Sequence, residues 1–520
     1  YLFWSVVQQN LNDTTLTFGF YDTYYSGVPY GINIMANVAP APKQVTNYTL
    51  PNSWMPIDSV KYIAFVKAAV ERYDGDGVND MPGLINPIQY WQVGNEPNDR
   101  GGKKDFAKLQ KMTYLAIKEA CPECKVLVGG VAQPVQPGIG FITNKDDYFT
   151  QFSTSYEPIL RELNGSGFDI FDFHWYGKAT GDYKLMKPIY EQLRLILEQY
   201  NFINIPAWIT EMGAYSGFPS GDSGLYAYQT ELQQARDYLK RFVFSLSLGV
   251  EKIFPAFGLM EGFKGNDGYF DHTGFIYDGE GSNDLGRGVK KLSYYTYKKM
   301  VEMLEGSDWK NIATIQEQNG IHIYKFTKPF DGAQCKPVWV AWNDSSVTRT
   351  ITISGINSDR VKATEAVPKY ESGKDVADYT TAFQTDTLVV TNGAAALTLG
   401  QRPVFIEPLT VTSVEYEGEN IPKEFILYQN YPNPFNPTTT IQFSLTPSLS
   451  QWERVSEGRV RVTLKVFDVL GREVATLVNG ELNTGEHSVV FEAKSLSGGV
   501  YFYRLRAAGF IQTKKMLISK

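Results

Sequence analysis

Two glutamates that each follow a β-prone apolar run are the residues best suited to chemistry. Glu96 ends the run "YWQVGNEP", where it lies between Asn95 and Pro97, and Glu211 ends "PAWITE". If both runs are strands of one parallel barrel, both carboxylates lie at the carboxyl-end rim, where barrel active sites form. Glycoside cleavage requires two such groups, because one protonates the leaving oxygen while the other attacks the anomeric carbon or activates water.

The surroundings of the two carboxylates should assign their roles. We expect a drier setting to keep the acid protonated and hydrogen bonds to keep the nucleophile ionised. A single Glu after a strand is more often a surface or helix-capping residue, so the hypothesis rests on the pair. In a retaining enzyme the two carboxyl groups lie about 5 to 5.5 Å apart, and a separation of roughly 8 Å would exclude that mechanism.

A third strand, "FDIFDFHWYG", carries further polar groups. With a period of two, Ile170, Asp172, His174 and Tyr176 share one face, and the last two lie nearest the rim. These side chains could contact substrate or a carboxylate. The alternative for His174 is a core histidine whose ring is satisfied by hydrogen bonds.

The elements that must position these residues alternate between strands and helices from about residue 30 to 305. Amphipathic stretches with apolar residues at intervals of three and four separate short β-branched runs, which is the pattern of a parallel sheet or barrel. We predict a barrel domain over residues 1–309. The six expected strands are 31–38, 88–94, 125–131, 168–176, 206–212 and 250–259.

The rest of the chain is all-β. Residues 310–409 contain short alternating strands and predict a separate antiparallel sandwich, which either binds glycan or supports the barrel. The polar, acidic stretch 410–424 predicts a linker. Residues 425–520 again contain only β-patterned runs and predict a second sandwich.

Residues 30–305 resemble the clan GH-A glycoside hydrolases, retaining (β/α)₈ barrel enzymes, and are nearest to families 39 and 5. The resemblance rests on Asn95-Glu96-Pro97 and Glu211. It implies that Glu96 is the acid/base at the end of strand 4, that Glu211 is the nucleophile at the end of strand 7, and that Asn95 donates to the sugar 2-hydroxyl.

The same resemblance assigns further site residues. His174 and Tyr176 match a His-x-Tyr pattern whose imidazole or hydroxyl holds the nucleophile or binds sugar. On the last strand the clan usually has a Trp as a sugar platform, whereas this sequence has Phe257. The departure changes the platform and therefore bears on substrate preference.

Counting strands back from Glu211 as strand 7 makes residues 31–38 strand 3. The fold expected is therefore an α/β TIM barrel that lacks its first two strands, and residues 1–30 look like the loop and helix after strand 2. A barrel short of two strands leaves edges open. We thus expect the chain to be a fragment that lacks roughly fifty or more N-terminal residues, any signal peptide among them.

The last 95 or so residues resemble the C-terminal sorting domain of the type IX secretion system. The segments "NYPNPFNPTTTIQFSL", "VFDVLGREVATLV", "SGGVYFYRL" and "TKKMLISK" carry the resemblance. It implies recognition by the type IX secretion machinery and export across a Gram-negative outer membrane, followed by release or surface anchoring.

Two smaller motifs leave alternatives open. Asp74, Asp76 and Asp80 in "RYDGDGVND" could surround a structural Ca²⁺, or they could form a solvated Asp-Gly turn, since the full calcium-loop pattern is not met. Catalysis itself implies no cofactor. Cys121 and Cys124 form either a local disulfide or two free thiols, because a zinc site would need a second pair of ligands.

Charge and hydropathy limit the partners. The net charge of −7 and the lack of a basic run argue against nucleic acid, and no uninterrupted apolar stretch reaches the length of a transmembrane segment. We therefore expect a secreted or outer-membrane-surface glycosidase that acts on a polysaccharide or oligosaccharide. The alternative is a non-catalytic carbohydrate-binding surface protein on an incomplete barrel.

Overall fold

The computed structural model describes most of the chain and divides it into two compact units, Tyr1–Val411 and Thr412–Lys520. The predicted linker 410–424 lies outside the described residues. Those residues are 1–97, 102–222, 224–256, 258–328, 336–409, 425–445, 459–483, 485–494, 496–507 and 510–519.

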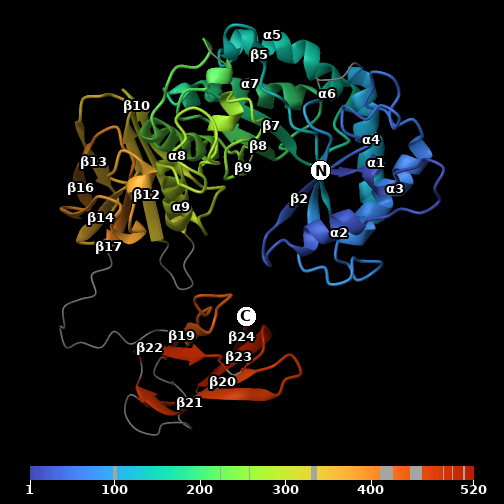
Figure 1. Ribbon diagram of the computed structural model, residues 1–520. Helices are drawn as coiled ribbons and strands as arrows, with labels where there is room; N and C mark the ends of the chain where they lie inside the picture. Colours follow the sequence, from blue (N-terminus) through green and yellow to red (C-terminus); the bar gives the residue numbers. More distant parts are fainter. Residues whose placement is uncertain are drawn as a thin grey trace. The chain divides into compact units, whose positions relative to one another are not determined.

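Parallel strands form the framework of residues 1–309, here called the α/β part (Figure 1). They pair in the orders β1-β2-β3-β4 and β7-β8-β9, and parallel bridges from Leu127 to Ile170 and from Val131 to Phe173 join β4 to β7. Within the described residues, β1 and β9 do not pair with each other. The strands are β1 (Leu2–Phe3), β2 (Ile34–Ala39), β3 (Ile88–Val93), β4 (Lys125–Leu127), β7 (Phe171–Tyr176), β8 (Ala207–Gly213) and β9 (Lys252–Pro255).

The prediction of six strands, with none before residue 31, is wrong by one strand. Leu2 and Phe3 pair in parallel with Val38 and Ala39, so β1 covers part of the β2 edge that the sequence had left open. Two residues followed at once by the helical turn of α1 are too short to show a period of two, which is why the pattern did not predict a strand.

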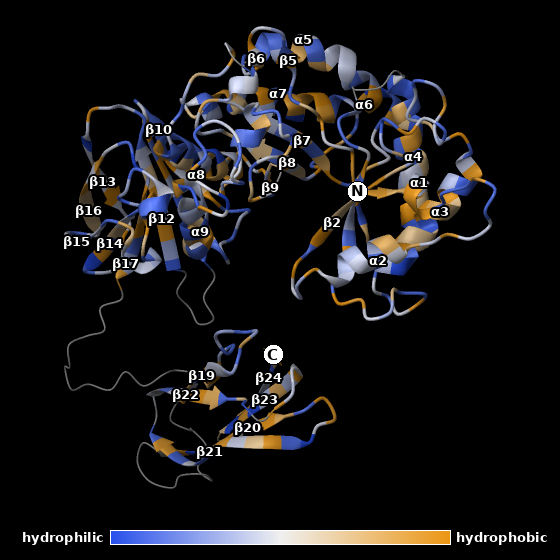
Figure 2. Ribbon diagram, viewed as in Figure 1, coloured by the Kyte–Doolittle hydropathy of each residue, from blue (hydrophilic) through white to orange (hydrophobic). Residues whose placement is uncertain are grey.

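Helices alternate with the strands, and their apolar sides pack in the same core as the outward-facing strand residues. Hydrophilic and hydrophobic residues both occur along α7 and α8, as amphipathic packing requires (Figure 2). Asp58 caps α3, and Thr230 with Gln233 forms a capping box on α8. The helices are α1 (Trp4–Val7), α2 (Gly19–Ser26), α3 (Ser59–Tyr73), α4 (Lys103–Ala120), α5 (Lys145–Ser155), α6 (Glu157–Leu163), α7 (Met186–Gln199), α8 (Glu231–Ser247) and α9 (Leu292–Leu304).

Two local features complete the α/β part. A short antiparallel hairpin joins β5 (Val135–Gln136) to β6 (Gly140–Phe141). After α4, Cys121 and Cys124 form a disulfide with their Cα atoms 5.4 Å apart, so the structure has the first of the two alternatives left by the sequence.

The inner face of the parallel strands is built in layers. The lower layer is apolar and consists of Met35, Tyr90, Leu127, Ile170, Trp208 and Phe254. Two residues further along four of these strands, on the same face, stand Asn37, Gln92, Asp172 and Thr210, which we call the polar layer. Hydrogen bonds join Asn37 to Gln92 and both Gln92 and Thr210 to Asp172.

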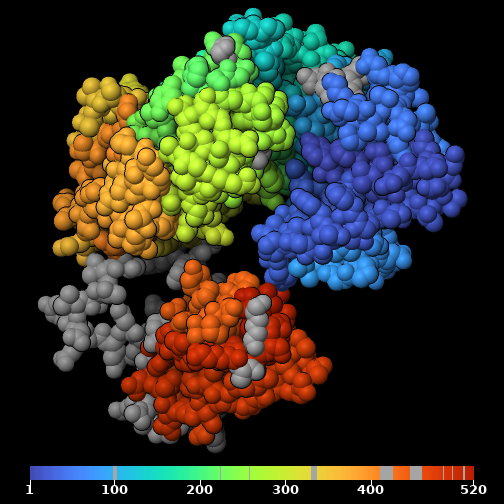
Figure 3. Space-filling view, in the orientation of Figure 1, coloured from blue at the N-terminus to red at the C-terminus, as the bar shows by residue number. Residues whose placement is uncertain are grey.

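Residues 310–409 form an antiparallel sandwich that belongs to the same compact unit (Figures 1 and 3). Along β12, Trp339 and Ala341 face the core between the two sheets, while Val340 and Trp342 join the core of the α/β part. Both faces are therefore buried. The larger sheet has the order β10-β11-β12-β17-β14-β15 and the smaller one β13-β16, and the strands are β10 (Ala313–Gln318), β11 (Ile321–Lys328), β12 (Lys336–Asn343), β13 (Arg349–Ser354), β14 (Arg360–Glu365), β15 (Thr385–Val389), β16 (Ala394–Leu399) and β17 (Val404–Leu409).

The second unit is also an antiparallel sandwich with its own core. Its sheets have the orders β18-β19-β22 and β21-β20-β23-β24. Asn430 is buried and donates from its amide nitrogen to Thr439, which fixes the segment before β19. The strands are β18 (Ile426–Leu427), β19 (Thr438–Leu445), β20 (Arg459–Phe467), β21 (Glu473–Asn483), β22 (Gly485–Glu492), β23 (Gly499–Ala507) and β24 (Phe510–Ile518). Among the helices that the structure describes in either unit, none has the length and apolar character needed to cross a bilayer.

Candidate active site

Glu96 is held at the end of β3 by a left-handed backbone conformation with φ of 49°. Its N–H donates to the carbonyl oxygens of Gly129 and Gly130, at 2.9 and 3.1 Å. A Cβ on Gly129 would lie 2.3 Å from the carbonyl oxygen of Val93, so only glycine permits this approach. The predicted strand 125–131 therefore ends at Leu127, because its last residues form the turn that receives Glu96.

Glu211 reaches the inner face through a β-bulge. Phe173 on β7 pairs with Ile209 on β8, but the next residue, His174, pairs with Glu211, so Thr210 is the extra residue. Thr210 and Glu211 consequently both point inward, whereas strict alternation would send Glu211 outward with Ile209. The bulge aims the carboxylate at the site.

His174 bridges the two glutamates. Its Nδ1 lies 2.8 Å from Oε1 of Glu96 and 3.4 Å from Oε2 of Glu211. Tyr176, two residues along β7, donates a short hydrogen bond from its hydroxyl to Glu211. One carboxylate oxygen of Glu96 and one of Glu211 lie within 4.8 Å of each other.

The structure thus brings Glu96, His174, Tyr176 and Glu211 together at the carboxyl ends of three strands. Asn95 lies beside them: its side-chain oxygen and Nε2 of His174 both stand 2.6 Å from the place that a Cβ on Gly130 would occupy. Phe257, the predicted sugar platform, lies outside the described residues.

Burial and charge set the protonation states. Burial would lower the pKa of His174, but the negative charges of Glu211 and Glu96 outweigh it and raise this pKa to about 9. Burial raises the pKa of Glu211, which the charge of His174 and the bond from Tyr176 offset only in part. The pKa of the Tyr176 hydroxyl is raised well above its usual value by burial and by Glu211, so Tyr176 stays a donor.

The expectation that the acid occupies the drier setting is wrong for this pair. The Glu211 side chain is 20% exposed and that of Glu96 is 39% exposed, so the predicted nucleophile is the drier group. The reason is the bulge, which places Glu211 within the strand, whereas Glu96 follows the end of its strand. The other half of the expectation agrees with the structure, because Glu211 accepts the hydrogen bond from Tyr176.

Two cavities meet at Glu96. One, of about 250 Å³, lies toward the N-terminal strands and the other, of about 420 Å³, lies toward the loops after β4, β8 and β9. Aromatic rings line both, which suits the apolar faces of sugars. The first is lined in part by Tyr1, Phe3, Trp54, Asn95 and Glu96, and the second by Glu96, Gln133, Phe141, Tyr176, Tyr226 and Phe270.

Sequence reasoning missed the residues that support the site. Gln92 and Thr210 of the polar layer, the Gly129-Gly130 turn and the aromatic Phe141 were not singled out. A usable signal existed, because Asn37 and Gln92 interrupt otherwise apolar strands, and a polar residue on the inner face of a buried strand requires a partner.

The predicted calcium loop follows α3, apart from the glutamate pair. Asp74, Asp76 and Asp80 each offer a carboxylate oxygen within 4.8 Å of the others. Asp80 already accepts the N–H groups of Gly75 and Gly77, at 3.0 and 2.8 Å. Burial raises the pKa of Asp74 to about 6.

A solved glycoside hydrolase shares the fold of most of this chain. A family 39 glycoside hydrolase from Bacteroides cellulosilyticus WH2 aligns with a TM-score of 0.53 and 16% identity over 78% of this chain and 74% of that one. A bifunctional glucanase-xylanase from a metagenome library (TM-score 0.47, 10% identity, 76% and 86% covered) and a glucosidase from Croceicoccus marinus (0.45, 15%, 92% and 80%) align less closely. At this identity the likeness is one of fold. No curated protein sequence matches the chain.

The second unit is identified by its sequence. Residues 429–519 match the Secretion system C-terminal sorting domain family, which confirms the prediction made for this part of the chain. Such a domain is read by the type IX secretion machinery of Gram-negative bacteria. The chain therefore combines a glycoside hydrolase fold with a sorting domain that directs export to the cell surface or the medium.

Proposed function

We propose that this exported protein is a retaining glycoside hydrolase that cleaves β-glycosidic bonds of a polysaccharide or oligosaccharide. The observation that carries the proposal is the pair of carboxylates, Glu96 and Glu211, with oxygens within 4.8 Å of each other on the rim of a parallel sheet. Retaining enzymes place their carboxyl groups about 5 to 5.5 Å apart, whereas inverting enzymes need roughly 6.5 to 9.5 Å to admit water.

The first step in this proposal forms a covalent intermediate. A Glu211 oxygen attacks the anomeric carbon, the bond from that carbon to the leaving oxygen breaks, and Glu96 gives its proton to the leaving oxygen. His174 supports this step because its imidazolium lies between the two carboxylates and shares a proton with Glu96. Tyr176 orients the attacking carboxylate through its hydroxyl.

The second step returns the enzyme to its starting state. Glu96 takes a proton from water, the water oxygen attacks the anomeric carbon, and the ester bond to Glu211 breaks. Asn95 beside Glu96 is proposed to donate to the sugar 2-hydroxyl, as in the clan that the sequence resembles. Within that clan's (β/α)₈ barrel, β1 would take the place of strand 2.

The test compares wild type with Glu96→Gln and Glu211→Gln on a panel of aryl β-glycosides and polysaccharides. Glu119→Gln is the matched control, because Glu119 is an exposed residue whose carboxylate pairs with Lys67. We expect the control to be fully active, both site variants to be inactive, and NMR to show a first product with the β-anomeric configuration of the substrate. Added azide should restore turnover and give a β-glycosyl azide with Glu96→Gln but an α-glycosyl azide with Glu211→Gln.

Other outcomes would change the proposal in defined ways. An inverted first product would remove the retaining mechanism. Full activity in Glu211→Gln would remove the nucleophile assignment. Binding of a polysaccharide by wild type without any turnover would instead favour the non-catalytic carbohydrate-binding alternative.

A further inference from the structure

Asp172 is a fully buried carboxylate at the centre of the polar layer, one layer below the proposed catalytic residues. A single oxygen, Oδ2, accepts three hydrogen bonds: from Nε2 of Gln92 at 2.5 Å, from the N–H of Gly130 at 2.9 Å and from the hydroxyl of Thr210 at 3.1 Å. These donors come from β3, from the turn after β4 and from β8, so Asp172 on β7 ties four consecutive parts of the sheet together.

Two of these donors lead directly to the catalytic pair. Gly130 links Asp172 to Glu96, because its N–H donates to Asp172 while its carbonyl oxygen accepts the N–H of Glu96. Thr210 is the extra residue of the bulge and immediately precedes Glu211, so its bond to Asp172 holds the bulge in place. A single residue therefore connects Asp172 to each glutamate: Gly130 to Glu96 and Thr210 to Glu211.

Burial raises the pKa of Asp172, while the three donors and the charge of His174, which lies two residues along the same strand, oppose that rise; the carboxylate in turn raises the pKa of His174. His174 also faces Glu96 from the end of β3, Glu211 from β8 and Tyr176 from its own strand. Among the described residues, neither Oδ1 of Asp172 nor Nε2 of His174 has a hydrogen-bond partner, and both are buried. A negative charge in that position stabilises the imidazolium through a medium of low dielectric.

We propose that Asp172 is a positioning residue that sets the spacing of Glu96 and Glu211 and supplies the negative charge beneath His174. The proposal rests on the proposed function for its kinetic consequences. It also predicts a change in the titration of His174 that does not depend on catalysis.

The test is Asp172→Asn, which keeps the shape of the side chain and removes its charge. The matched control is Asp169→Asn, three residues earlier, whose carboxylate accepts the N–H of Val126 and pairs with Lys118, both at 2.9 Å. We expect Asp172→Asn to lower kcat roughly 100-fold with little change in KM, because a displaced catalytic group loses reactivity more than binding. Asp169→Asn should stay within roughly two-fold of wild type, since it contacts none of the site residues.

NMR titration of the His174 ring provides the second readout. Its pKa, about 9 in the wild type, should fall in Asp172→Asn, because the nearby carboxylate is one of the charges that raise it. It should be unchanged in Asp169→Asn. Equal kcat and an equal His174 pKa in the two variants would overturn the proposal. A wild type that cleaves no glycoside would contradict the proposed function, and the titration would still decide on Asp172.

If Asp172→Asn does not fold, Thr210→Val isolates one of its contacts. This change removes a single hydroxyl next to Glu211, and we expect kcat to fall roughly ten-fold while KM stays constant. Thr210→Ser, which keeps the hydroxyl, should restore kcat. Wild-type kcat in Thr210→Val would show that Asp172 does not act through the bulge.

Discussion

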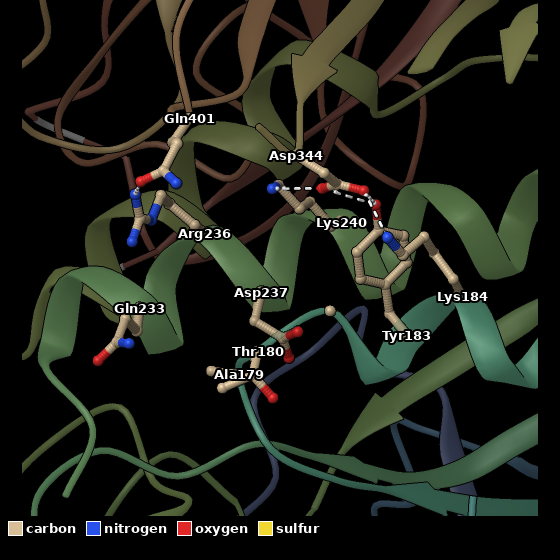
Figure 4. Close-up of a pocket in the computed structure, with 11 residues that line it drawn as sticks. Ala179, Thr180, Tyr183, Lys184, Gln233, Arg236, Asp237, Lys240, Asp344 and Gln401 are labelled. Carbon is tan, nitrogen blue, oxygen red and sulfur yellow. Dashed lines mark hydrogen bonds and ion pairs between the residues drawn. The ribbon is translucent and has the colours of Figure 1, made fainter. Parts of the chain in front are cut away.

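The candidate active site and the junction between the α/β part and the sandwich are built from similar side chains with opposite charge balance. In the candidate active site, two carboxylates share one imidazole, His174. At the junction, a single carboxylate, Asp344, meets Lys240 at 2.9 Å, Lys184 at 3.0 Å and the hydroxyl of Tyr183 at 2.9 Å (Figure 4). His322 from β11 adds a further contact at 3.3 Å.

This difference in balance shifts the pKa values in opposite directions. Burial raises the pKa of Glu211, and one shared imidazolium does not cancel that effect. Burial acts on Asp344 in the same direction, but His322 and Lys240, with the other donors around the carboxylate, hold its pKa well below the usual range. A carboxylate with donors in excess is fixed as an anion, which suits a structural role, whereas one short of donors stays reactive.

The cavity at the junction differs from the candidate active site in the same way. It measures about 230 Å³ and lies beside Lys184, Arg236, Lys240 and Asp344 (Figure 4). These charged groups already have partners: Asp344 pairs with the two lysines, and Arg236 donates to the side-chain oxygen of Gln401 at 2.7 Å. The contacts join the α/β part to the sandwich.

The largest expected effect is the loss of activity in Glu211→Gln. Removing the proposed nucleophile should lower kcat by roughly 10⁴-fold. The variant should be at least as stable as wild type, because it removes a buried charge whose pKa is raised. Activity assays measure kcat and thermal unfolding measures stability. A stable variant with wild-type kcat would contradict the role of Glu211 as nucleophile.

Neutralising Asp344, the carboxylate at the junction, should lower stability and leave activity unchanged. We expect Asp344→Asn to lower the free energy of unfolding by about 3 kcal/mol and to leave kcat unchanged, because the buried ammonium of Lys240 loses its partner. The pKa of Asp344 is lowered in the folded state, so its contribution is present above its unfolded pKa and is lost as pH falls.

Urea unfolding at several pH values tests this prediction. The difference between wild type and Asp344→Asn should be largest near neutral pH and should shrink below about pH 4, where the unfolded carboxyl becomes protonated. A difference that stays constant with pH would contradict the charge-based explanation.

Each of the two carboxylates accepts a hydrogen bond from a tyrosine, Glu211 from Tyr176 and Asp344 from Tyr183. Tyr176→Phe removes the donor to Glu211, so the pKa of Glu211 should rise further and the acid limb of the pH–rate profile should move to higher pH, with kcat roughly ten-fold lower. Tyr183→Phe removes the corresponding donor to Asp344 and should lower stability only. An unmoved acid limb in Tyr176→Phe would argue against Glu211 as the ionised group.

The smallest expected effect concerns the third carboxylate cluster, Asp74, Asp76 and Asp80. Unlike the carboxylates of the other two centres, these three form no ion pair with a lysine or histidine among the residues that the structure describes, so a cation would come from solvent. If it is Ca²⁺, a concentration roughly five times Kd should raise the free energy of unfolding by about 1 kcal/mol.

Calorimetry with calcium and with a chelator checks this proposal. Asp76→Asn together with Asp80→Asn should remove the calcium effect, while Asp308→Asn, in a surface turn that also bonds backbone N–H groups, should retain it. Identical unfolding with calcium and with chelator in the wild type would leave the loop as an Asp-Gly turn.

Much of the site could be predicted, because alternate residues of a strand point to the same face of the sheet. His174 and Tyr176 fall on the inner face, as the strand pattern predicted. The apolar runs that carry Glu96 and Glu211 become β3 and β8, which are parallel neighbours of β4 and β7 respectively. The pattern fails at Thr210, because a bulge inserts a residue without changing composition. It also fails at β1, where only two residues pair.

By itself, the sequence determined which residue types stand at the ends of the strands and that the last segment is a sorting domain, because both are written in local order. Only the tertiary structure decided that Glu211 turns inward and is drier than Glu96, and that Asp172 bonds to the parts that hold both glutamates. Register and burial arise from contacts between residues far apart in the chain, and those contacts set the charge balance of the site.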